Sequence, residues 1–169
     1  SYQFARLALK AKYYNKSIYY IAEKLYGVEP DEQFLQVICS LLIKGNRTDK
    51  EYHEYFRLAV EANLKIIGLN EFFIRSMDFE TYDLIPQRVL IYFTYSNSLD
   101  YLEKAYLYSN VLRNKEKYEE VYGAYYSKML PFIEEQLLKG RINEHLAYLY
   151  TCFQKEVLEK PDNWKAVCD

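Results

Sequence analysis

The sequence predicts an all-α protein in which antiparallel helix pairs stack as an α-α superhelix, a right-handed array like those of repeat proteins. Two observations favour this class. Apolar residues recur at helical spacing in one segment after another, and only very short turns separate the segments. Helices joined by short turns must fold back on one another, so neighbours become antiparallel. No segment rich in Gly, Ser or Pro divides the chain, which predicts a single helical domain over residues 1–169.

Three helices are expected before residue 46. Apolar spacing from Phe4 to Ala11 predicts a helix over residues 2–13. Ser17 is expected to cap a second helix that contains Ile18, Ile21, Ala22 and Leu25 and ends near Gly27. Pro30 suits the first position of a third helix, and Gly45 suits its end. The apolar stripe of that third helix comprises Phe34, Val37, Ile38, Leu41 and Leu42.

The next segment contains the clearest helix start. Thr48 and Glu51 have the spacing of a capping box, in which each side chain accepts from the other residue's backbone N–H. A helix of about five turns is expected to follow and to end at Gly68. Asn70 is then expected to cap a shorter helix, and residues 78–85 to form a polar connection.

Residues 86–95 admit two secondary structures. The run from Val89 to Thr94 has the composition of a strand, and periodicity cannot decide so short a run. We predict a helix, because a lone strand would leave its backbone groups unpaired. Pro86 in the first turn agrees with a helix.

Three further helices are expected after residue 96. Asn97 or Ser98 should cap the first, with Leu99, Leu102, Ala105, Tyr106, Ser109 and Leu112 facing inward. The second should cover about residues 115–138, with a kink or break at Pro131. Asn143 should cap a final long helix that passes through Val157 and ends at Pro161, after which Trp164 and Val167 should pack back onto the body. Residues 41–47 resemble residues 136–141, which suggests a repeated helix end.

The composition argues against several classes of function. The 22 basic and 24 acidic residues leave a net charge of -2 and no basic stripe, so nucleic acid is not an expected partner. No apolar run approaches the roughly 18 residues of a spanning helix, so we expect no membrane contact from this segment. Cys39, Cys152 and Cys168 lack metal-ligand spacing and favour reduced thiols in the cytoplasm. The chain begins with Ser1, and we expect it to be a fragment of a longer protein.

The histidines and cysteines do not form a recognisable reactive group. His53 and His145 have no second ligand at zinc-helix spacing, and the chain has no glycine-rich phosphate loop or nucleophile elbow. Cys152 is expected in mid-helix, where a thiol is normally inert. We therefore expect no catalytic residue, no metal and no cofactor, and hence no enzyme.

Paired acids and buried amides are the remaining candidates for functional residues. The neighbours Glu119 and Glu120, like Glu134 and Glu135, point about 100° apart on a helix and should be solvated charges. Two asparagines, Asn63 and Asn110, fall on apolar faces. A buried asparagine is usually a structural link between helices, and ligand binding is the alternative.

Twenty tyrosines also allow two interpretations. Tyrosine buries a large ring and keeps a hydroxyl for a partner. The tyrosines can therefore be semi-buried packing residues, or they can form a protein-binding surface.

Two resemblances are present. Ala105 and Ala147 near the middles of paired helices make the architecture similar to tetratricopeptide-type repeats, although the signature of that motif is not found in order. Three segments resemble a family of long uncharacterised proteins from anaerobic Gram-positive bacteria: residues 85–93 (IPQRVLIYF), 104–110 (KAYLYSN) and 132–150 (FIEEQLLKGRINEHLAYLY). The resemblance implies that the chain is one block of a longer array, and it implies no activity.

Three functions follow as hypotheses. The leading one is a helical-repeat scaffold that binds a protein or peptide in a groove between stacked pairs. The alternative is a purely structural spacer in a large multidomain protein, which would self-associate through uncovered end helices. The third is a cryptic enzyme or small-molecule carrier with a pocket between helices.

Overall fold

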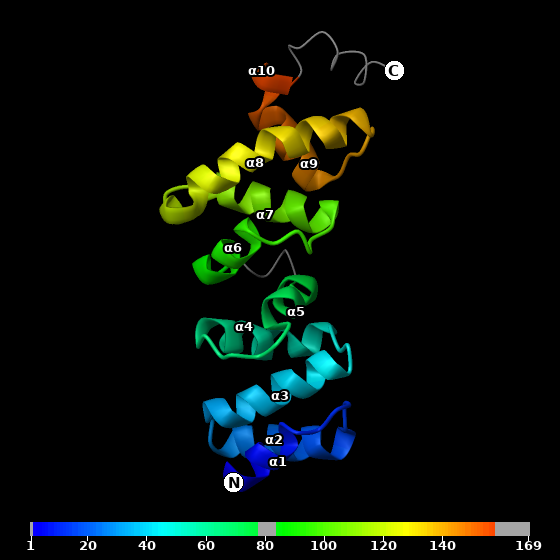
Figure 1. Cartoon of the computed structure of the whole chain (residues 1–169), viewed down its shortest axis with the longest axis vertical. Helices are drawn as coiled ribbons and strands as arrows, with labels where there is room; N and C mark the ends of the chain where they lie inside the picture. The colour runs from blue at the N-terminus through cyan, green and yellow to red at the C-terminus, as the bar shows by residue number, and fades with distance from the viewer. Residues whose placement is uncertain (1, 78–83, 158–169) are drawn as a thin grey trace. The chain divides into compact units, whose positions relative to one another are not determined.

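The computed structural model describes residues 2–77 and 84–157 (Figure 1). Within these residues all regular secondary structure is helical, which confirms the predicted all-α class. Contacts between Cα atoms divide the chain into two compact units, Ser1–Pro86 and Gln87–Asp169, and each unit is described by itself below. That they form one folding domain stays a prediction.

The first unit is built around α3. Its described part contains α1 (Tyr2–Ala8), α2 (Lys16–Val28), α3 (Glu32–Lys44), a 3-10 turn η1 (Lys50–Tyr52), α4 (His53–Glu61) and α5 (Leu69–Ser76). Helix α3 packs against α1, α2, α4 and α5, and α4 also packs against α5 (Figure 1). All five residues of its predicted stripe are buried, together with Leu35 and Cys39. Burial of this apolar set is the main stabilisation of the unit.

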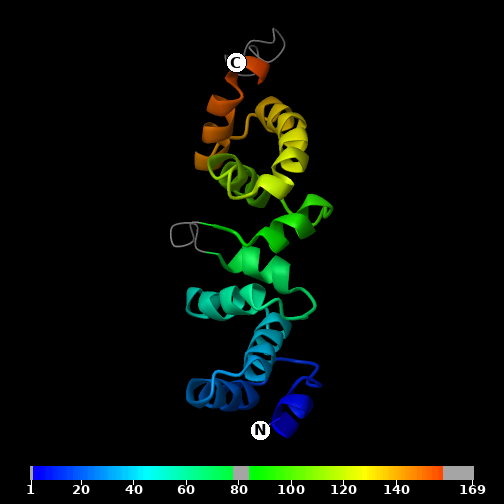
Figure 2. The same cartoon turned by 90° about the vertical axis from the view of Figure 1, so that its left-hand side faces the viewer.

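The second unit is a group of three mutually packed helices with a short helix at each end. It contains α6 (Gln87–Thr94), α7 (Tyr101–Arg113), α8 (Glu119–Leu138), α9 (Glu144–Cys152) and α10 (Gln154–Val157). Helices α7, α8 and α9 contact one another, α6 packs on α8, and α10 packs on α8 and α9 (Figure 2). Apart from α1 and α6, which pack on the next helix but one, helices that follow one another in the chain therefore pack together as pairs.

Side chains cap the starts of several helices as predicted, although often from a different residue than the one predicted. The predicted cap Asn143 is confirmed: its Oδ1 accepts from the backbone N of Leu146 at 2.8 Å. Asn15 caps α2 in place of Ser17, and Asp100 caps α7 in place of Asn97 or Ser98. Aspartate and asparagine are as effective at this position as serine.

Three helices end with the same hydrogen-bond pattern. Asn46, Asn63 and Gly140 have left-handed backbones, with φ of 52°, 56° and 65°. After each, a backbone N–H reaches back to a carbonyl five residues earlier, as in Arg47 to Leu42 (2.8 Å) and Arg141 to Gln136 (3.0 Å). This shared ending is the physical basis of the likeness between residues 41–47 and 136–141.

Two predicted helices were too long, and such an ending explains one of them. The helix expected from Thr48 to Gly68 begins as the 3-10 turn η1 and ends at Glu61, since Asn63 adopts the left-handed conformation. No capping box forms at Thr48, because Asp49 occupies the cap position without a side-chain hydrogen bond. The helix predicted for residues 2–13 ends at Ala8.

In the second half of the chain, one predicted helix is confirmed and two predicted helix boundaries are wrong. The helix predicted for residues 86–95 is confirmed as α6. Of the kink or break predicted at Pro131, the break was wrong, because α8 continues through that residue to Leu138, and the kink stays a prediction. The final long helix was also wrong: a turn at Phe153 separates α9 from α10. Pro161, Trp164, Val167 and most of the connection at 78–85 lie outside the described residues.

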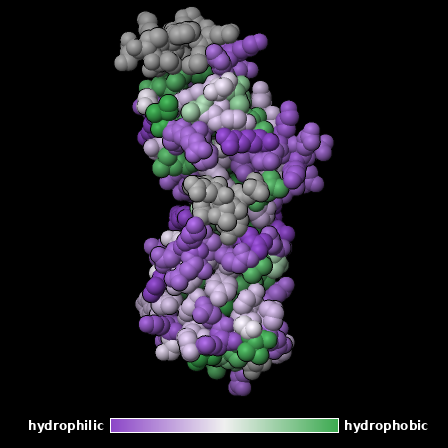
Figure 3. All heavy atoms as spheres, turned by 180° about the vertical axis from the view of Figure 1, so that it is seen from behind, coloured by the Kyte–Doolittle hydropathy of each residue, from purple (hydrophilic) through white to green (hydrophobic). Residues whose placement is uncertain are grey.

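Some residues predicted to face inward are on the surface. Leu7, Ile21 and Leu102 have exposed fractions of 63%, 45% and 47%. Hydrophilic residues predominate on the face in Figure 3, where the hydrophobic ones form small separate groups. Single exposed apolar residues of this kind are normal for folded proteins.

Gly45 is required for packing, and its backbone conformation is ordinary (φ -87°). A Cβ at this position would lie 2.7 Å from Cβ and 2.9 Å from Cγ of Tyr14. We therefore predict that Gly45→Ala lowers the free energy of unfolding by about 1–3 kcal/mol, because the Tyr14 stem must move. Gly27→Ala is the matched control, since no atom lies within 4 Å of its added Cβ. Urea unfolding of both variants measures the difference, and equal stabilities would contradict this packing constraint.

Candidate functional site

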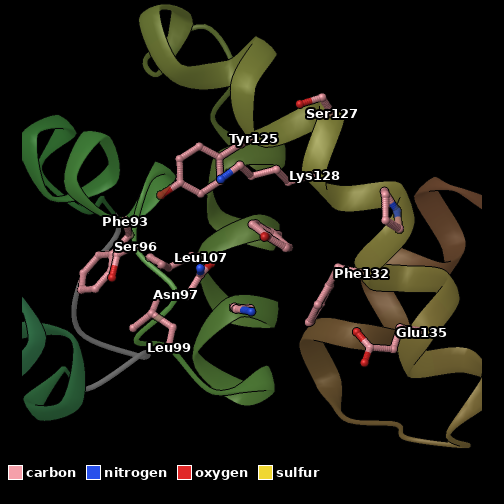
Figure 4. Close-up of a pocket in the computed structure, with 13 residues that line it drawn as sticks. Phe93, Ser96, Asn97, Leu99, Leu107, Tyr125, Ser127, Lys128, Phe132 and Glu135 are labelled. Carbon is pink, nitrogen blue, oxygen red and sulfur yellow. The ribbon is translucent and has the colours of Figure 1, made fainter.

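A cleft of about 390 Å³ lies in the second unit between α7, α8 and the loop that joins α6 to α7 (Figure 4). We call it the α7–α8 cleft. Four lining residues come from the end of α6 and the following loop, three from α7 and six from α8. They are Phe93, Ser96, Asn97 and Leu99, then Lys104, Leu107 and Tyr108, then Tyr125, Ser127, Lys128, Pro131, Phe132 and Glu135.

The floor of the cleft is buried and largely aromatic. The Tyr108 ring makes edge contacts with two rings of α8, at centroid distances of 5.7 Å to Tyr125 and 5.0 Å to Phe132. Edge-to-face pairs of this kind are favoured because the positive ring edge meets the negative ring face. Phe93, Leu99 and Leu107 complete the buried part. The floor therefore offers a rigid apolar surface to a ligand.

Helix α8 fixes the wall formed by the end of α6. The hydroxyl of Tyr125 donates to the carbonyl oxygen of Leu90 at 2.7 Å, and Nζ of Lys128 donates to the carbonyl oxygen of Thr94. The Thr94 carbonyl ends α6 and has no partner within that helix, so Lys128 satisfies it. The Leu90 carbonyl accepts both from Tyr125 and from Oγ1 of Thr94 in its own helix, the latter at 2.7 Å. Figure 4 shows Tyr125 and Lys128 extending from α8 on the same side. Burial raises the pKa of Tyr125, which keeps its hydroxyl protonated and able to donate.

The rim of the cleft is polar and exposed. Asn97, Ser127, Lys128 and Glu135 are all exposed, and Lys104 is half-buried. Glu135 accepts a hydrogen bond from Nζ of Lys139 at 2.8 Å. That bond, with the more distant charges of Lys104 and Arg141, holds the pKa of Glu135 below its ordinary value. The carboxylate of Glu135 is thus already compensated by neighbouring cations.

The chemistry of the lining residues is that of a binding surface. It combines an aromatic floor, two ammonium groups, one carboxylate and the hydroxyl or amide groups of Ser96, Asn97 and Ser127. No cysteine or histidine is among these thirteen described residues. The sequence interpretation did not single out this set. A signal was present, because Tyr125, Lys128 and Phe132 share one face of α8 at helical spacing.

The structure does not bring the sequence candidates together. Nδ1 of His145, on α9, lies 3.1 Å from Oγ of Ser109. The His145 ring packs edge-on against Tyr106, with 5.3 Å between the ring centroids. Asn110 accepts from the hydroxyl of Tyr118 at 2.9 Å, so it links α7 to the start of α8. Asn63, in contrast, is exposed in the turn after α4.

The remaining candidates are scattered. His53 is half-buried at the start of α4, and Glu119 and Glu120 are exposed. Cys39 is buried with its thiol 3.4 Å from the Tyr55 carbonyl, and burial raises its pKa. Cys152, expected in mid-helix, is the exposed last residue of α9.

The first unit has a second, more apolar groove of about 460 Å³. Helix α3 forms one side, and the segment before α5 forms another. Its lining residues are Leu9, Gln36, Ser40, Ile43, Lys44, Lys65, Ile66 and Ile67. Lys44 donates from Nζ to the carbonyls of Leu9 and Ala11, which ties the end of α3 to the segment after α1.

The described residues contain neither a candidate metal cluster nor a candidate membrane-spanning helix. In residues 2–77 and 84–157, no three or more His, Cys, Asp or Glu side chains gather in a way that could hold a metal ion. Within the same ranges, every helix is too short or too polar to cross a bilayer.

His145 predicts a pH dependence of stability. Burial lowers its pKa, as does the charge of Arg113, while Glu144 opposes the shift. In the unfolded chain His145 has an ordinary pKa of about 6.5 and binds a proton more readily than in the folded chain. The folded state therefore keeps its full stability above about pH 6.5 and loses part of it as the pH falls toward the lower pKa of folded His145. Urea unfolding at about pH 7.5 and about pH 5.5 should show a smaller loss for His145→Gln than for the unmodified chain. The same loss in both proteins would show that His145 titrates normally.

Comparison with known proteins identifies the family. No curated protein and no solved structure matches the chain. The N-terminal region of a family of unknown function, DUF5717, matches residues 1–167. Because the match covers nearly the whole sequence, the chain belongs to the DUF5717 family and corresponds to its N-terminal region.

Proposed function

We propose that this chain is a non-enzymatic helical scaffold that binds a segment of a protein or peptide in the α7–α8 cleft. The observation that carries the proposal is the combination of a buried aromatic floor with an exposed polar rim. Interfaces have this composition, with aromatic anchors at the centre and polar groups around them.

The size of the cleft suits a few side chains of a partner. Its volume of about 390 Å³ is in the lower range of ligand sites, and exposed residues border it. Rigidity also favours binding, since Tyr125 and Lys128 hold α6 and α8 together before any ligand arrives. A preformed site avoids much of the ordering cost of association.

The proposal also includes the superhelical arrangement of the helices, the class of partner and the cellular location. Packing of successive helices as pairs supports a right-handed α-α superhelix that continues in a longer protein. The near-balanced charge supports a protein partner over nucleic acid. We also propose a cytoplasmic location without membrane contact of this segment, as expected from the cysteine pattern.

Occlusion of the cleft tests the binding function. Peptides are selected from a random display library against the chain, and their affinities are compared for Ser127→Trp and for the control Thr151→Trp. Ser127 lines the cleft, whereas Thr151 is exposed on α9 outside it. An indole in the cleft should lower affinity by about tenfold or more, comparable to the loss of an interface anchor. Failure to select any peptide, or equal affinities for both variants, would contradict the proposal.

The alternative function is a structural spacer, and the surface of α1 is the observation that favours it. Tyr2 and Leu7 on this helix have exposed fractions of 53% and 63%, as expected of an end helix that a neighbouring block would cover. A spacer block should self-associate as its concentration rises in sedimentation experiments, and Leu7→Lys should keep it monomeric. Gln3→Lys, which adds the same charge to an exposed polar position of α1, should still self-associate. A monomer at all concentrations would argue against the spacer.

A further inference from the structure

Two donors on α7 stand out in the cleft because they make no hydrogen bond with the rest of the described chain. Tyr108 is only 8% exposed, yet its interactions are ring contacts with Tyr125 and Phe132. Lys104 interacts with the charge of Glu135 and has no hydrogen-bond partner for its ammonium group among the described residues. The Tyr108 hydroxyl is not among the fully buried polar atoms of the described residues, so a ligand in the cleft can reach it.

The two donors belong to one face. Lys104 and Tyr108 are four residues apart on α7, which places their side chains next to each other, and both line the cleft. The other charged groups nearby are already used. Lys128 donates to the Thr94 carbonyl, Glu135 accepts from Lys139, and the carboxylate of Asp100 caps α7.

We infer that the α7–α8 cleft selects a peptide segment with an acidic side chain, whose carboxylate is bound jointly by Nζ of Lys104 and the hydroxyl of Tyr108. A carboxylate accepts hydrogen bonds only, so it matches a pair of donors, and its charge compensates the ammonium group. The apolar residues beside the acidic one pack on the floor formed by Tyr125 and Phe132. This inference rests on the proposed function, because it specifies the partner of the same cleft.

Local charge supports an anion over a cation. Around Glu135 stand three cations, Lys104, Lys139 and Arg141, and Lys128 lies on the same rim. An incoming carboxylate therefore enters a region with more positive than negative groups. A basic side chain of a partner would have to compete with Lys139 for the Glu135 carboxylate. It would also bring a further hydrogen-bond donor to the Tyr108 hydroxyl, where an acceptor is needed.

The experiment compares two peptides that differ only in one charge. The probes are Ac-Gly-Leu-Glu-Phe-Gly-NH2 and its glutamine counterpart, titrated into the chain by calorimetry at low salt. We expect the glutamate peptide to bind about tenfold more tightly, the gain typical of a charge-assisted hydrogen bond. Lys104→Ala should remove that preference, and Tyr108→Phe, which deletes only the hydroxyl, should reduce it by about threefold or more. Each effect is measured as the ratio of the two peptides' affinities for the same variant, so a general loss of binding cancels.

Matched controls keep the test specific. Lys155→Ala removes an exposed lysine of α10, and Tyr126→Phe removes a hydroxyl from an exposed tyrosine of α8. Both should retain the preference for the glutamate peptide. Circular dichroism melting of each variant should show an intact fold, and Tyr108→Phe keeps the ring contacts even if Lys104→Ala proves unstable.

The outcomes separate this inference from the proposed function. Equal affinity of the two peptides, both weakened by Ser127→Trp, would overturn the carboxylate inference and leave the cleft as a peptide site. A glutamate preference that survives Lys104→Ala and Tyr108→Phe would also overturn it, because the carboxylate would then bind elsewhere. No binding of either peptide, combined with no peptide selected from the display library, would overturn both.

Discussion

The hydrogen bonds from Tyr125 and Lys128 of α8 to carbonyl groups of α6 are the interactions on which the α7–α8 cleft depends. Helix α6 is only eight residues long, and an isolated helix of that length is unstable in water. Its buried residues Val89, Leu90 and Phe93 and the carbonyl group of its last residue need partners from another helix. Helix α8 supplies them through Tyr125 and Lys128, one turn apart. The cleft exists because these contacts hold α6 and α8 together while the α6–α7 loop leaves space beside them.

Tyrosines have the same function at other places in the chain. In the first unit the hydroxyls of Tyr19 and Tyr55 donate to one carboxylate oxygen of Glu23, at 2.7 and 3.1 Å, and so join α2 to α4. In the second, Tyr118 bonds to Asn110, and Tyr150 donates to the Arg141 carbonyl at 2.6 Å. Such residues pack an aromatic ring and satisfy a polar group of the same helix, a turn or a neighbouring helix at the same time. Tyr108 differs from them, since its ring is packed and its hydroxyl is available to a ligand.

The sequence predicts the helices better than their ends. Periodicity located the apolar stripe of α3, and the reasoning about unpaired backbone placed α6 correctly against its strand-like composition. It failed where a single left-handed residue decides a helix end, because asparagine adopts that conformation only in some contexts. Asn63 was interpreted as a buried polar residue, although it ends α4 at the surface. Pro131 predicts a kink or break, but no break occurs, because packing of α8 against α6 and α7 outweighs one missing hydrogen bond.

The candidate site could not be predicted from the sequence, for a related reason. Its residues come from α6, a loop, α7 and α8, and their convergence depends on tertiary packing that periodicity does not encode. Lys104 and Tyr108 resemble ordinary residues of an amphipathic helix. They become distinctive only when the hydrogen bonds of their neighbours are known, because those bonds leave these two donors unused.

The most direct test of the account is chemical-shift mapping of the 15N-labelled chain on addition of a selected peptide. If the chain is a scaffold with a preformed cleft, the largest amide shifts will fall on Ser96, Asn97, Lys104, Tyr108 and Lys128. The signals of α9 should change little. Shifts spread evenly over both units, or concentrated at residues outside the cleft, would contradict it.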